Sequence, residues 1–230
     1  MLIIIIVGFM IASWVVSSRL KNKFKKYSKE TLGSGLSGSE IAELMLRDNG
    51  IYDVSVISVP GKLTDHYNPA NKTVNLSPDV YDGRSAAAAA VAAHECGHAL
   101  QHDKAYRWLE FRSAMVPIQN VSAKVINFMF IAMFLGAFAL PGLINPQTAL
   151  LIIIGCYSVF TLFAFVTLPV EYDASKRALA WISDRNIVNG REHDMAKDAL
   201  NTAAQTYLVA ALGALATLLY YVMVFLGGDE

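Results

Sequence analysis

The sequence is poor in charged residues and has no excess of either sign. Lys and Arg number 19, as do Asp and Glu, and charged residues make up 17% of the 230 residues. With a formal net charge of zero, the composition does not indicate a nucleic-acid partner or an acidic substrate. The hydrophobic content of 54% is too high for a disordered chain or an ordinary soluble domain. The composition therefore indicates a membrane protein.

Cysteine is also scarce, since Cys96 and Cys156 are the only two in the chain. They lie far apart in the sequence, and Cys156 is inside an apolar run. A small secreted domain held together by disulfides would contain more cysteines. Neither cysteine belongs to a CxxC pair of the kind that binds metal. We therefore expect two reduced thiols.

Long hydrophobic runs, in contrast, are prominent. A spanning helix needs about 20 mostly apolar residues, and four segments approach this length: Leu2–Val16, Val125–Leu140, Ala149–Leu168 and Tyr207–Leu226. The first could instead be a cleaved signal peptide, but positive charges precede the apolar part of a signal peptide and none precedes this one. An uncleaved anchor is favoured, and we expect about four transmembrane helices.

The positions of Lys and Arg predict the orientation of these spans. Fourteen of the nineteen lie between the first two spans and the other five lie between the last two. The turn Pro141–Thr148 and both ends of the chain have none. The positive-inside rule therefore places both polar segments in the cytoplasm. The basic run Arg19–Lys29 would lie beside the membrane, either held by anionic lipid or as a solvated tether.

The first polar segment contains helix and strand patterns. After the Gly- and Ser-rich stretch Gly33–Ser39, an amphipathic pattern predicts a short helix over Ser39–Leu46, ended by Asn49 and Gly50. Two β-type runs follow, at Tyr52–Val59 and Lys72–Leu76, with a turn between them. The second predicted strand, around Thr73 to Leu76, could pair with an extended peptide.

An alanine-rich helix is predicted next. Ser85 can cap its N-terminus, and the alanines from Ala86 onward favour helix and close packing. No proline interrupts the sequence as far as His102. This helix contains His94-Glu-Cys-Gly-His98, an HExxH pattern.

The chemistry of HExxH depends on its helical spacing. Histidines four residues apart face the same side of a helix, about 6 Å apart along its axis. His94 and His98 can therefore reach one Zn²⁺, beside which Glu95 would act as a general base on a water molecule. A hydrogen-bonded histidine pair without metal is the alternative reading. The helical context and a candidate third ligand favour the metal.

A catalytic zinc usually has three protein ligands, so the third must come from elsewhere in the chain. His102 would lie about 12 Å from His94 along an unbroken helix, and we expect it at the surface. Glu171 is the better candidate because it follows the third span on the side of the membrane where His94 and His98 are expected. Pro169 and the neighbouring acids predict that a helix begins there, so Glu171 could instead be an ordinary first-turn acid.

Five stretches of the sequence resemble the YugP family of bacterial neutral zinc metallopeptidases: Gly61-Lys-Leu-Thr-Asp-His-Tyr-Asn-Pro, Leu76-Ser, Gly83-Arg-Ser, Ala92-Ala-His-Glu-Cys-Gly-His-Ala-Leu-Gln and Pro169-Val-Glu-Tyr-Asp-Ala-Ser. More distantly, the chain is similar to gluzincin membrane proteases of the HtpX and CaaX-prenyl-protease types. The resemblance implies one zinc ion held by His94, His98 and Glu171, with Glu95 as the catalytic base.

The chain departs from those relatives close to the third ligand. They often have an Asp four residues after the ligand Glu, where it orients a ligand His, and this chain has Ser175 there. Asp173 lies about 200° around the helix from Glu171, so it cannot simply take over the role. The group that stabilises the developing oxyanion is left open between His66 and Tyr67, on the expected loop between the strands, and Tyr172.

Together these features predict a mostly α-helical membrane protein with a small α+β zincin-like catalytic region. The regions are an N-terminal anchor (1–18), a cytoplasmic catalytic region (19–124), a transmembrane hairpin (125–168), a cytoplasmic helical segment with the third ligand (169–203) and a last spanning helix (204–230).

The predicted function is that of a zinc endopeptidase in a bacterial cell membrane, with its active site on the cytoplasmic face. Its partners would be protein or peptide substrates and the bilayer, with no nucleic acid. A non-catalytic zinc-binding scaffold and an intramembrane protease are the alternatives. Against the latter, Ala86–Ala93 is only weakly apolar, and charged residues lie on both sides of the HExxH segment.

The predicted orientation can be tested by cysteine labelling in intact cells. Ser34→Cys and Asn189→Cys should not react with a membrane-impermeant thiol reagent, because both positions are expected in the cytoplasm. A cysteine placed in the 141–148 turn should react. Labelling at position 34 or 189 would contradict the predicted orientation.

Overall fold

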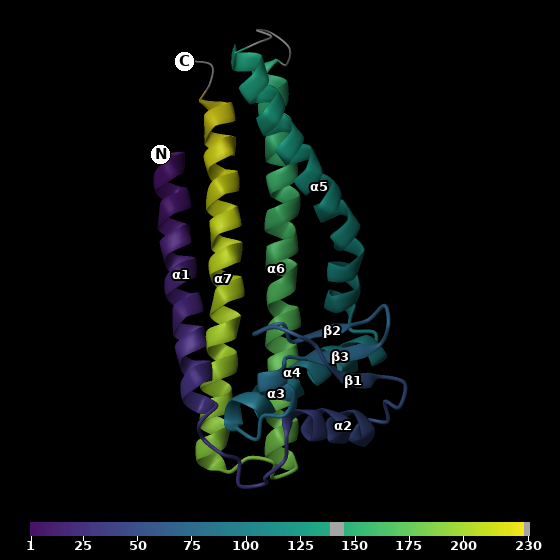
Figure 1. Cartoon of the computed structure of the whole chain (residues 1–230). Helices are drawn as coiled ribbons and strands as arrows, with labels where there is room; N and C mark the ends of the chain where they lie inside the picture. Colours follow the sequence, from purple (N-terminus) through teal and green to yellow (C-terminus); the bar gives the residue numbers. More distant parts are fainter. Residues whose placement is uncertain (139–144, 228–230) are drawn as a thin grey trace. The chain divides into compact units, whose positions relative to one another are not determined.

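Four long helices make up most of the chain (Figure 1). The computed structural model describes residues 1–138 and 145–227, without the side chains of 135–138. The long helices are α1 (Leu2–Tyr27), α5 (Arg107–Phe138), α6 (Pro146–Asp184) and α7 (Gly190–Leu226). Each contains a stretch long and apolar enough to cross a bilayer. The prediction of a mostly α-helical membrane protein with about four such helices is confirmed, whereas residues 141–144 of the predicted turn lie outside the described residues.

Helix α6 shows that the prediction of a helix start at Pro169 is wrong, because the helix continues through this residue. A proline inside a helix lacks one backbone N–H and costs about 3 kcal/mol. Val166 and Val170, on either side, are buried with exposures of 3% and 0%. Packing of both side chains against the protein holds the helix together across the proline and offsets the cost. Glu171 is therefore not a first-turn acid.

The chain forms two compact units. The first comprises Met1–Trp14, Phe111–Leu168 and Tyr207–Glu230. Its buried cluster includes Ile126, Ile153, Cys156 and Tyr221. The second unit comprises Val15–Glu110 and Pro169–Thr206, and it contains all the residues predicted to form the site.

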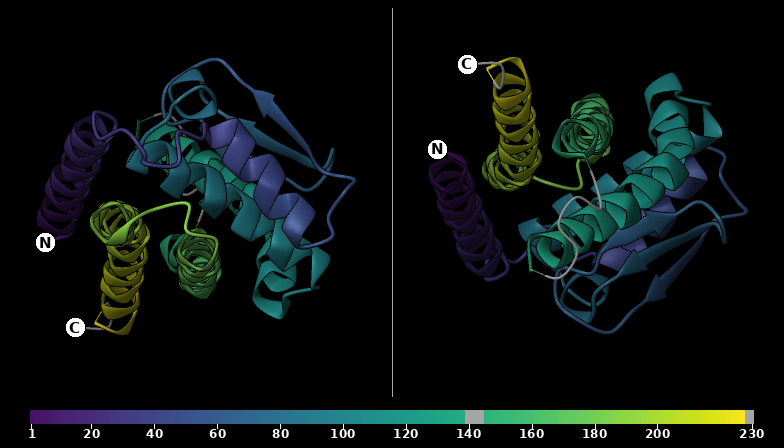
Figure 2. Two further views of the ribbon diagram at one scale, coloured as in Figure 1. Left: turned by 90° about the horizontal axis from the view of Figure 1, so that it is seen from below. Right: turned by 90° about the horizontal axis from the view of Figure 1, so that it is seen from above.

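Helix α4 (Ala86–Asp103) is at the centre of the second unit. Ser85 caps it by accepting a hydrogen bond from the Ala88 backbone N–H, as predicted. The alanines between residues 86 and 93 are all fully buried, so neighbouring elements can approach the helix closely. One of these neighbours is α2 (Gly38–Asp48), which packs along α4 in the view from below (Figure 2).

Helix α2 is the short amphipathic helix predicted from Ser39 to Leu46. Ser37 and Glu40 form a reciprocal capping box: Ser37 Oγ accepts from the Glu40 backbone N–H, and the Glu40 carboxylate accepts from the Ser37 backbone N–H. The fully buried side chains of Ile41 and Met45 contribute to the core.

A three-stranded sheet packs against α4 and α2. Its strands are β1 (Ser55–Ser58), β2 (His66–Asn68) and β3 (Thr73–Leu76), in the order β1-β3-β2. β1 is parallel to β3, and β2 is antiparallel to it. A short helix, α3 (Pro78–Tyr81), connects the sheet to α4.

The sheet corrects two expectations. His66 and Tyr67 belong to β2 and not to a loop; a three-residue strand is too short for alternation to reveal it in the sequence. β3 is the central strand, with β1 and β2 occupying both of its sides. It therefore has no free edge for an extended peptide. The outer sides of β1 and β2 are the edges of this sheet.

Helices α4 and α6 make backbone contact at Gly97. A Cβ atom at this position would lie 2.6 Å from the carbonyl oxygen and 3.0 Å from the Cα atom of Ala174. Only glycine permits this approach without movement of a helix, because the obstructing atoms are backbone. Gly97 lies between Cys96 and His98, so the approach brings the HExxH segment against α6 beside Glu171.

This contact predicts that Gly97→Ala destabilises the protein although alanine favours helix. Overpacking costs about 1–3 kcal/mol, which exceeds the gain of about 1 kcal/mol in helix propensity. The unfolding temperature of the metal-free protein should fall. Gly155→Ala on α6 is the control, because no heavy atom lies within 4 Å of its added Cβ, and it should be neutral or stabilising. Equal stability of the two variants would contradict the role of the Gly97 contact.

Candidate metal centre

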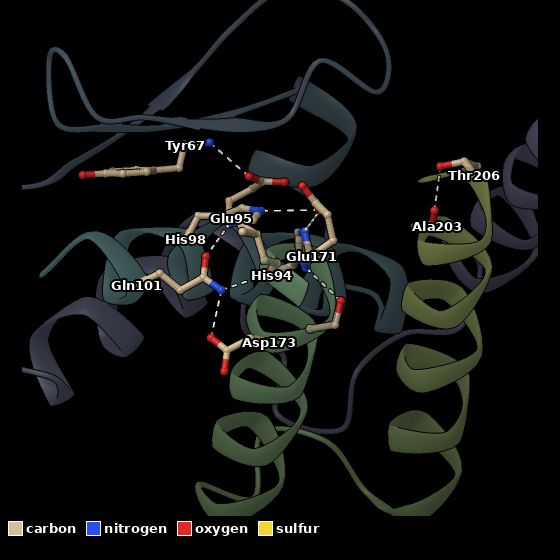
Figure 3. Close-up of polar contacts among 11 residues, drawn as sticks. Tyr67, His94, Glu95, His98, Gln101, Glu171, Asp173, Ala203 and Thr206 are labelled. Atoms are coloured by element: carbon tan, nitrogen blue, oxygen red, sulfur yellow. Dashed lines mark hydrogen bonds and ion pairs between the residues drawn. The ribbon is translucent and has the colours of Figure 1, made fainter. Parts of the chain in front are cut away.

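Three side chains from two helices converge in the second unit (Figure 3). His94 and His98 come from α4, and Glu171 comes from α6. The Nε2 atoms of His94 and His98 lie 3.3 and 3.6 Å from Glu171 Oε2. Ligand atoms from the three residues lie within 4.8 Å of one another. The structure thus brings together the histidine pair and the third ligand considered from the sequence.

Burial and hydrogen bonding control the charges of these groups. Burial opposes ionisation of Glu171, but the two imidazoles that face its carboxylate outweigh burial and hold the pKa of Glu171 well below its usual value. Burial also disfavours the charged form of His98, but the Glu171 carboxylate beside it raises the pKa of His98 above the usual value. The site therefore stabilises positive charge beside an ionised carboxylate, which is the electrostatic environment that a divalent cation requires.

Gln101 determines which nitrogen of His98 carries the proton. Its side-chain nitrogen lies 2.8 Å from the carbonyl oxygen of Val170 and 2.8 Å from Asp173 Oδ2. Both are acceptors, so this end of the amide must be the NH₂ donor. The amide oxygen then faces His98 Nδ1, at 3.0 Å. Nδ1 of His98 must therefore be the donor, and Nε2 can present its lone pair to a metal.

Ser175 lies beside His94 as Gln101 lies beside His98. Its Oγ lies 3.1 Å from His94 Nδ1, while the other ring nitrogen, Nε2, faces Glu171. A neutral hydroxyl forms a weaker hydrogen bond than a carboxylate does, so His94 is oriented without an additional negative charge. Asp173 forms a hydrogen bond with neither His94 nor His98. Its carboxylate accepts hydrogen bonds from Gln101 and from Arg177, at 2.8 and 2.6 Å.

Glu95 lies beside the three converging groups and is bound to the sheet (Figure 3). Its Oε2 accepts a hydrogen bond of 3.0 Å from the backbone N–H of Tyr67 in β2. The residue is 8% exposed. The contact fixes the carboxylate next to the metal-ligand candidates, although Glu95 does not belong to that group of three.

The other residues considered from the sequence lie outside the cluster. The His66 side chain is exposed, and its Nδ1 lies 2.7 Å from the Thr64 carbonyl oxygen. The Tyr67 hydroxyl bonds His102 Nδ1 at 2.8 Å, and His102 is exposed, as expected. Tyr172 is 47% exposed. Cys96 is fully buried, with its thiol near the Ala42 carbonyl oxygen, as expected for a residue of the core.

The donor set fits zinc. Two imidazole nitrogens and one carboxylate oxygen are the protein ligands of one class of catalytic zinc site, which leaves the fourth coordination position for water or substrate. Ligand histidines usually donate their other N–H to a neighbouring group, which fixes the ring. Here the second nitrogens of His94 and His98 contact Ser175 and Gln101. Both the donors and the groups behind them therefore suit this metal.

Comparison with known proteins agrees with this donor set. A family described as "Putative neutral zinc metallopeptidase" matches residues 2–226. The chain belongs to this family. Among curated proteins, the chain is similar to the "Putative membrane protease YugP" of Bacillus subtilis (strain 168), with 41% identity over 213 residues, which are 92% of this chain and 91% of the relative. No solved structure gives a significant match.

The sequence analysis did not identify Gln101 as a residue that orients a ligand histidine. A glutamine three residues after His98 on the same helix shares its face, and this spacing was the available signal. Sequence could not show the other half of the interaction, because Val170 and Asp173 are on α6. The contribution of Asp173 was missed for the same reason: it reaches His98 only through Gln101.

The ligand set predicts different effects for neighbouring residues of α6. Two histidines alone hold zinc weakly, so Glu171→Ala should lose most of its zinc and its activity together. Asp173→Ala is the matched control and should keep the metal, because Gln101 retains its hydrogen bond to the Val170 carbonyl. Ser175→Ala should have an intermediate effect. Metal analysis of the purified variants decides: full zinc in Glu171→Ala, or loss only in Asp173→Ala, would reassign the third ligand.

Gln101→Leu should weaken zinc binding without removing a ligand. The substitution deletes the acceptor for His98 Nδ1, and losses of such supporting groups typically cost about 10–100-fold in metal affinity. Competition with a chromogenic chelator measures the change. Gln205→Leu, at an exposed position on α7, controls for the same change of side chain and should retain wild-type affinity. Unchanged affinity in a folded Gln101→Leu protein would refute the orienting role.

Proposed function

We propose that this zinc metallopeptidase is a membrane-bound endopeptidase that cleaves membrane or membrane-proximal proteins, with one zinc ion held by His94, His98 and Glu171. The observation that carries the proposal is the convergence of these three side chains with Glu95 fixed beside them. A binding scaffold would need the three ligands, but it would have no use for a second carboxylate, Glu95, that does not hold the metal.

The proposed chemistry divides between the metal and Glu95. Bound zinc supplies Lewis-acid chemistry, polarising a peptide carbonyl and lowering the pKa of a water molecule to about 7. Glu95 takes the proton of the attacking water on its carboxylate and returns it to the leaving amine. The Tyr67 N–H engages Oε2, and no other hydrogen bond to the Glu95 side chain occurs among the described residues. Oε1 is therefore the oxygen proposed to exchange the proton.

Strand β2 is the proposed binding edge for substrate. The Tyr67 backbone N–H bonds Glu95, while the neighbouring strand β3 occupies the other side of β2. The outer edge of β2 therefore borders the general base. An extended peptide that paired with this edge by β-addition would have its backbone close to Glu95, as cleavage requires.

His66 is the proposed partner of the developing oxyanion. Its Nδ1 faces a carbonyl oxygen, which can only accept, so a neutral His66 carries its proton on Nδ1. The Nε2 atom could donate to an oxyanion only in the imidazolium form. Tyr67 is a weaker candidate because its hydroxyl already bonds His102, and Tyr172, which is 47% exposed, is the other candidate.

The proposed site is close to the membrane surface. Glu171 follows the predicted end of the third span, Leu168, by three residues, or about 5 Å of helix, and α6 is continuous between them. The distribution of Lys and Arg supports the cytoplasmic face. The name of the curated relative, a membrane protease, is consistent with this location in the cell membrane.

Replacement of the general base tests the proposal. Glu95→Gln should retain wild-type zinc content and lose hydrolysis of an unfolded protein substrate by about 10²–10⁴-fold, the contribution of a positioned acid–base group. Glu43→Gln, at an exposed position on α2, is the matched control and should remain active. Chelator should abolish wild-type activity. An active Glu95→Gln variant would exclude Glu95 as the base, and a wild-type protein that binds zinc without hydrolysis would favour the scaffold.

A further inference from the structure

A basic cavity of about 800 Å³ lies beside the second half of α1. Lys21 and Lys25 line it from α1, and Lys62, Leu63 and Asp79 line it from the other side. None of the residues that line the cavity belongs to the metal centre. Its volume is in the range of ordinary ligand pockets. The cavity is therefore a separate candidate binding site within the second unit.

The charges around the cavity are not balanced. Lys62 lies 3.6 Å from Asp79, so these two residues balance each other's charge. Lys21 and Lys25, four residues apart, lie on the same face of α1, where like charges repel. Within the described part of the chain, neither Lys21 nor Lys25 has an ion-pair partner. Two lysines without counterions at one cavity indicate that its ligand is an anion.

The position of these lysines along α1 indicates the source of the anion. The first predicted span ends near Ser18, and Lys21 and Lys25 follow it by three and seven residues. At 1.5 Å per residue they lie about 5 and 10 Å beyond the apolar segment, so Lys21 lies within a headgroup layer about 5–8 Å thick and Lys25 lies just beyond it. This step requires α1 to cross the membrane, and it is independent of the proposed peptidase activity.

Apolar side chains accompany the lysines. Phe24, between Lys21 and Lys25 in the sequence, also lines the cavity, and Leu63 is 44% exposed there. Ser28 adds a hydroxyl. We propose that this cavity binds the phosphate-bearing headgroup of an anionic phospholipid, with the lysine ammonium groups on the phosphate and with Phe24 and Leu63 against the carbon atoms of the headgroup.

Binding of a short-chain lipid tests the proposal on the full-length protein in neutral detergent. Dihexanoylphosphatidylglycerol should raise the unfolding temperature of the wild type in a saturable way, because a ligand of the folded state stabilises it. The double variant Lys21→Gln/Lys25→Gln should bind this lipid at least tenfold more weakly. The single variant Lys25→Gln should change in the same direction. Dihexanoylphosphatidylcholine should have little effect.

The control variant also removes two positive charges from the basic run Arg19–Lys29. Arg19→Gln/Lys29→Gln changes two exposed residues that do not line the cavity, and it should keep wild-type affinity. Equal losses in the two double variants would show diffuse attraction and would overturn the site. No response of the wild type, or an equal response to phosphatidylcholine, would also overturn it. If inorganic phosphate reproduced the full effect, the ligand would be a free anion and not a lipid.

Discussion

The backbone contact between α4 and α6 at Gly97 is the constraint on which the metal centre depends. His94 and His98 can face one point because they share a helix, but the third ligand belongs to another helix 73 residues further along the chain from His98. It reaches them because Gly97 has no side chain to separate its helix from Ala174. The buried alanines earlier in α4 allow other elements, such as α2, to pack closely against the same helix. Small residues thus determine the ligand geometry without contacting the metal.

The polar network around the histidines extends the same helix pairing. Gln101 on α4 bonds Val170 and Asp173 on α6, and Ser175 on α6 contacts His94 on α4. Buried polar groups are costly unless they are hydrogen-bonded, so these contacts define the rotation of one helix against the other, and those of Gln101 also define the His98 tautomer. The same contacts therefore hold the two helices together and orient the ligand histidines.

Helix α6 contains both an apolar segment suited to a membrane and polar residues of the candidate site. Its first part has the apolar composition of a membrane span, and its second part provides Glu171 and Ser175. Pro169 lies between these parts without ending the helix, since buried side chains on both sides offset the missing hydrogen bond. The continuous helix connects the acidic ligand directly to a membrane segment, which is the physical basis for expecting substrates close to the bilayer.

The sequence by itself determined the four apolar helices, the cap at Ser85 and the helical spacing of His94 and His98. These features depend on residues a few positions apart, so periodicity and capping rules reveal them. It also suggested Glu171 from its place just after the third apolar run, although it predicted a helix start at Pro169 that the structure does not have. Only the tertiary structure decided the third strand at Tyr67, the central position of β3, and the partners of Gln101 and Ser175. Those features depend on contacts between distant segments, where a close approach of two backbones selects which side chains meet, and no local pattern specifies that approach.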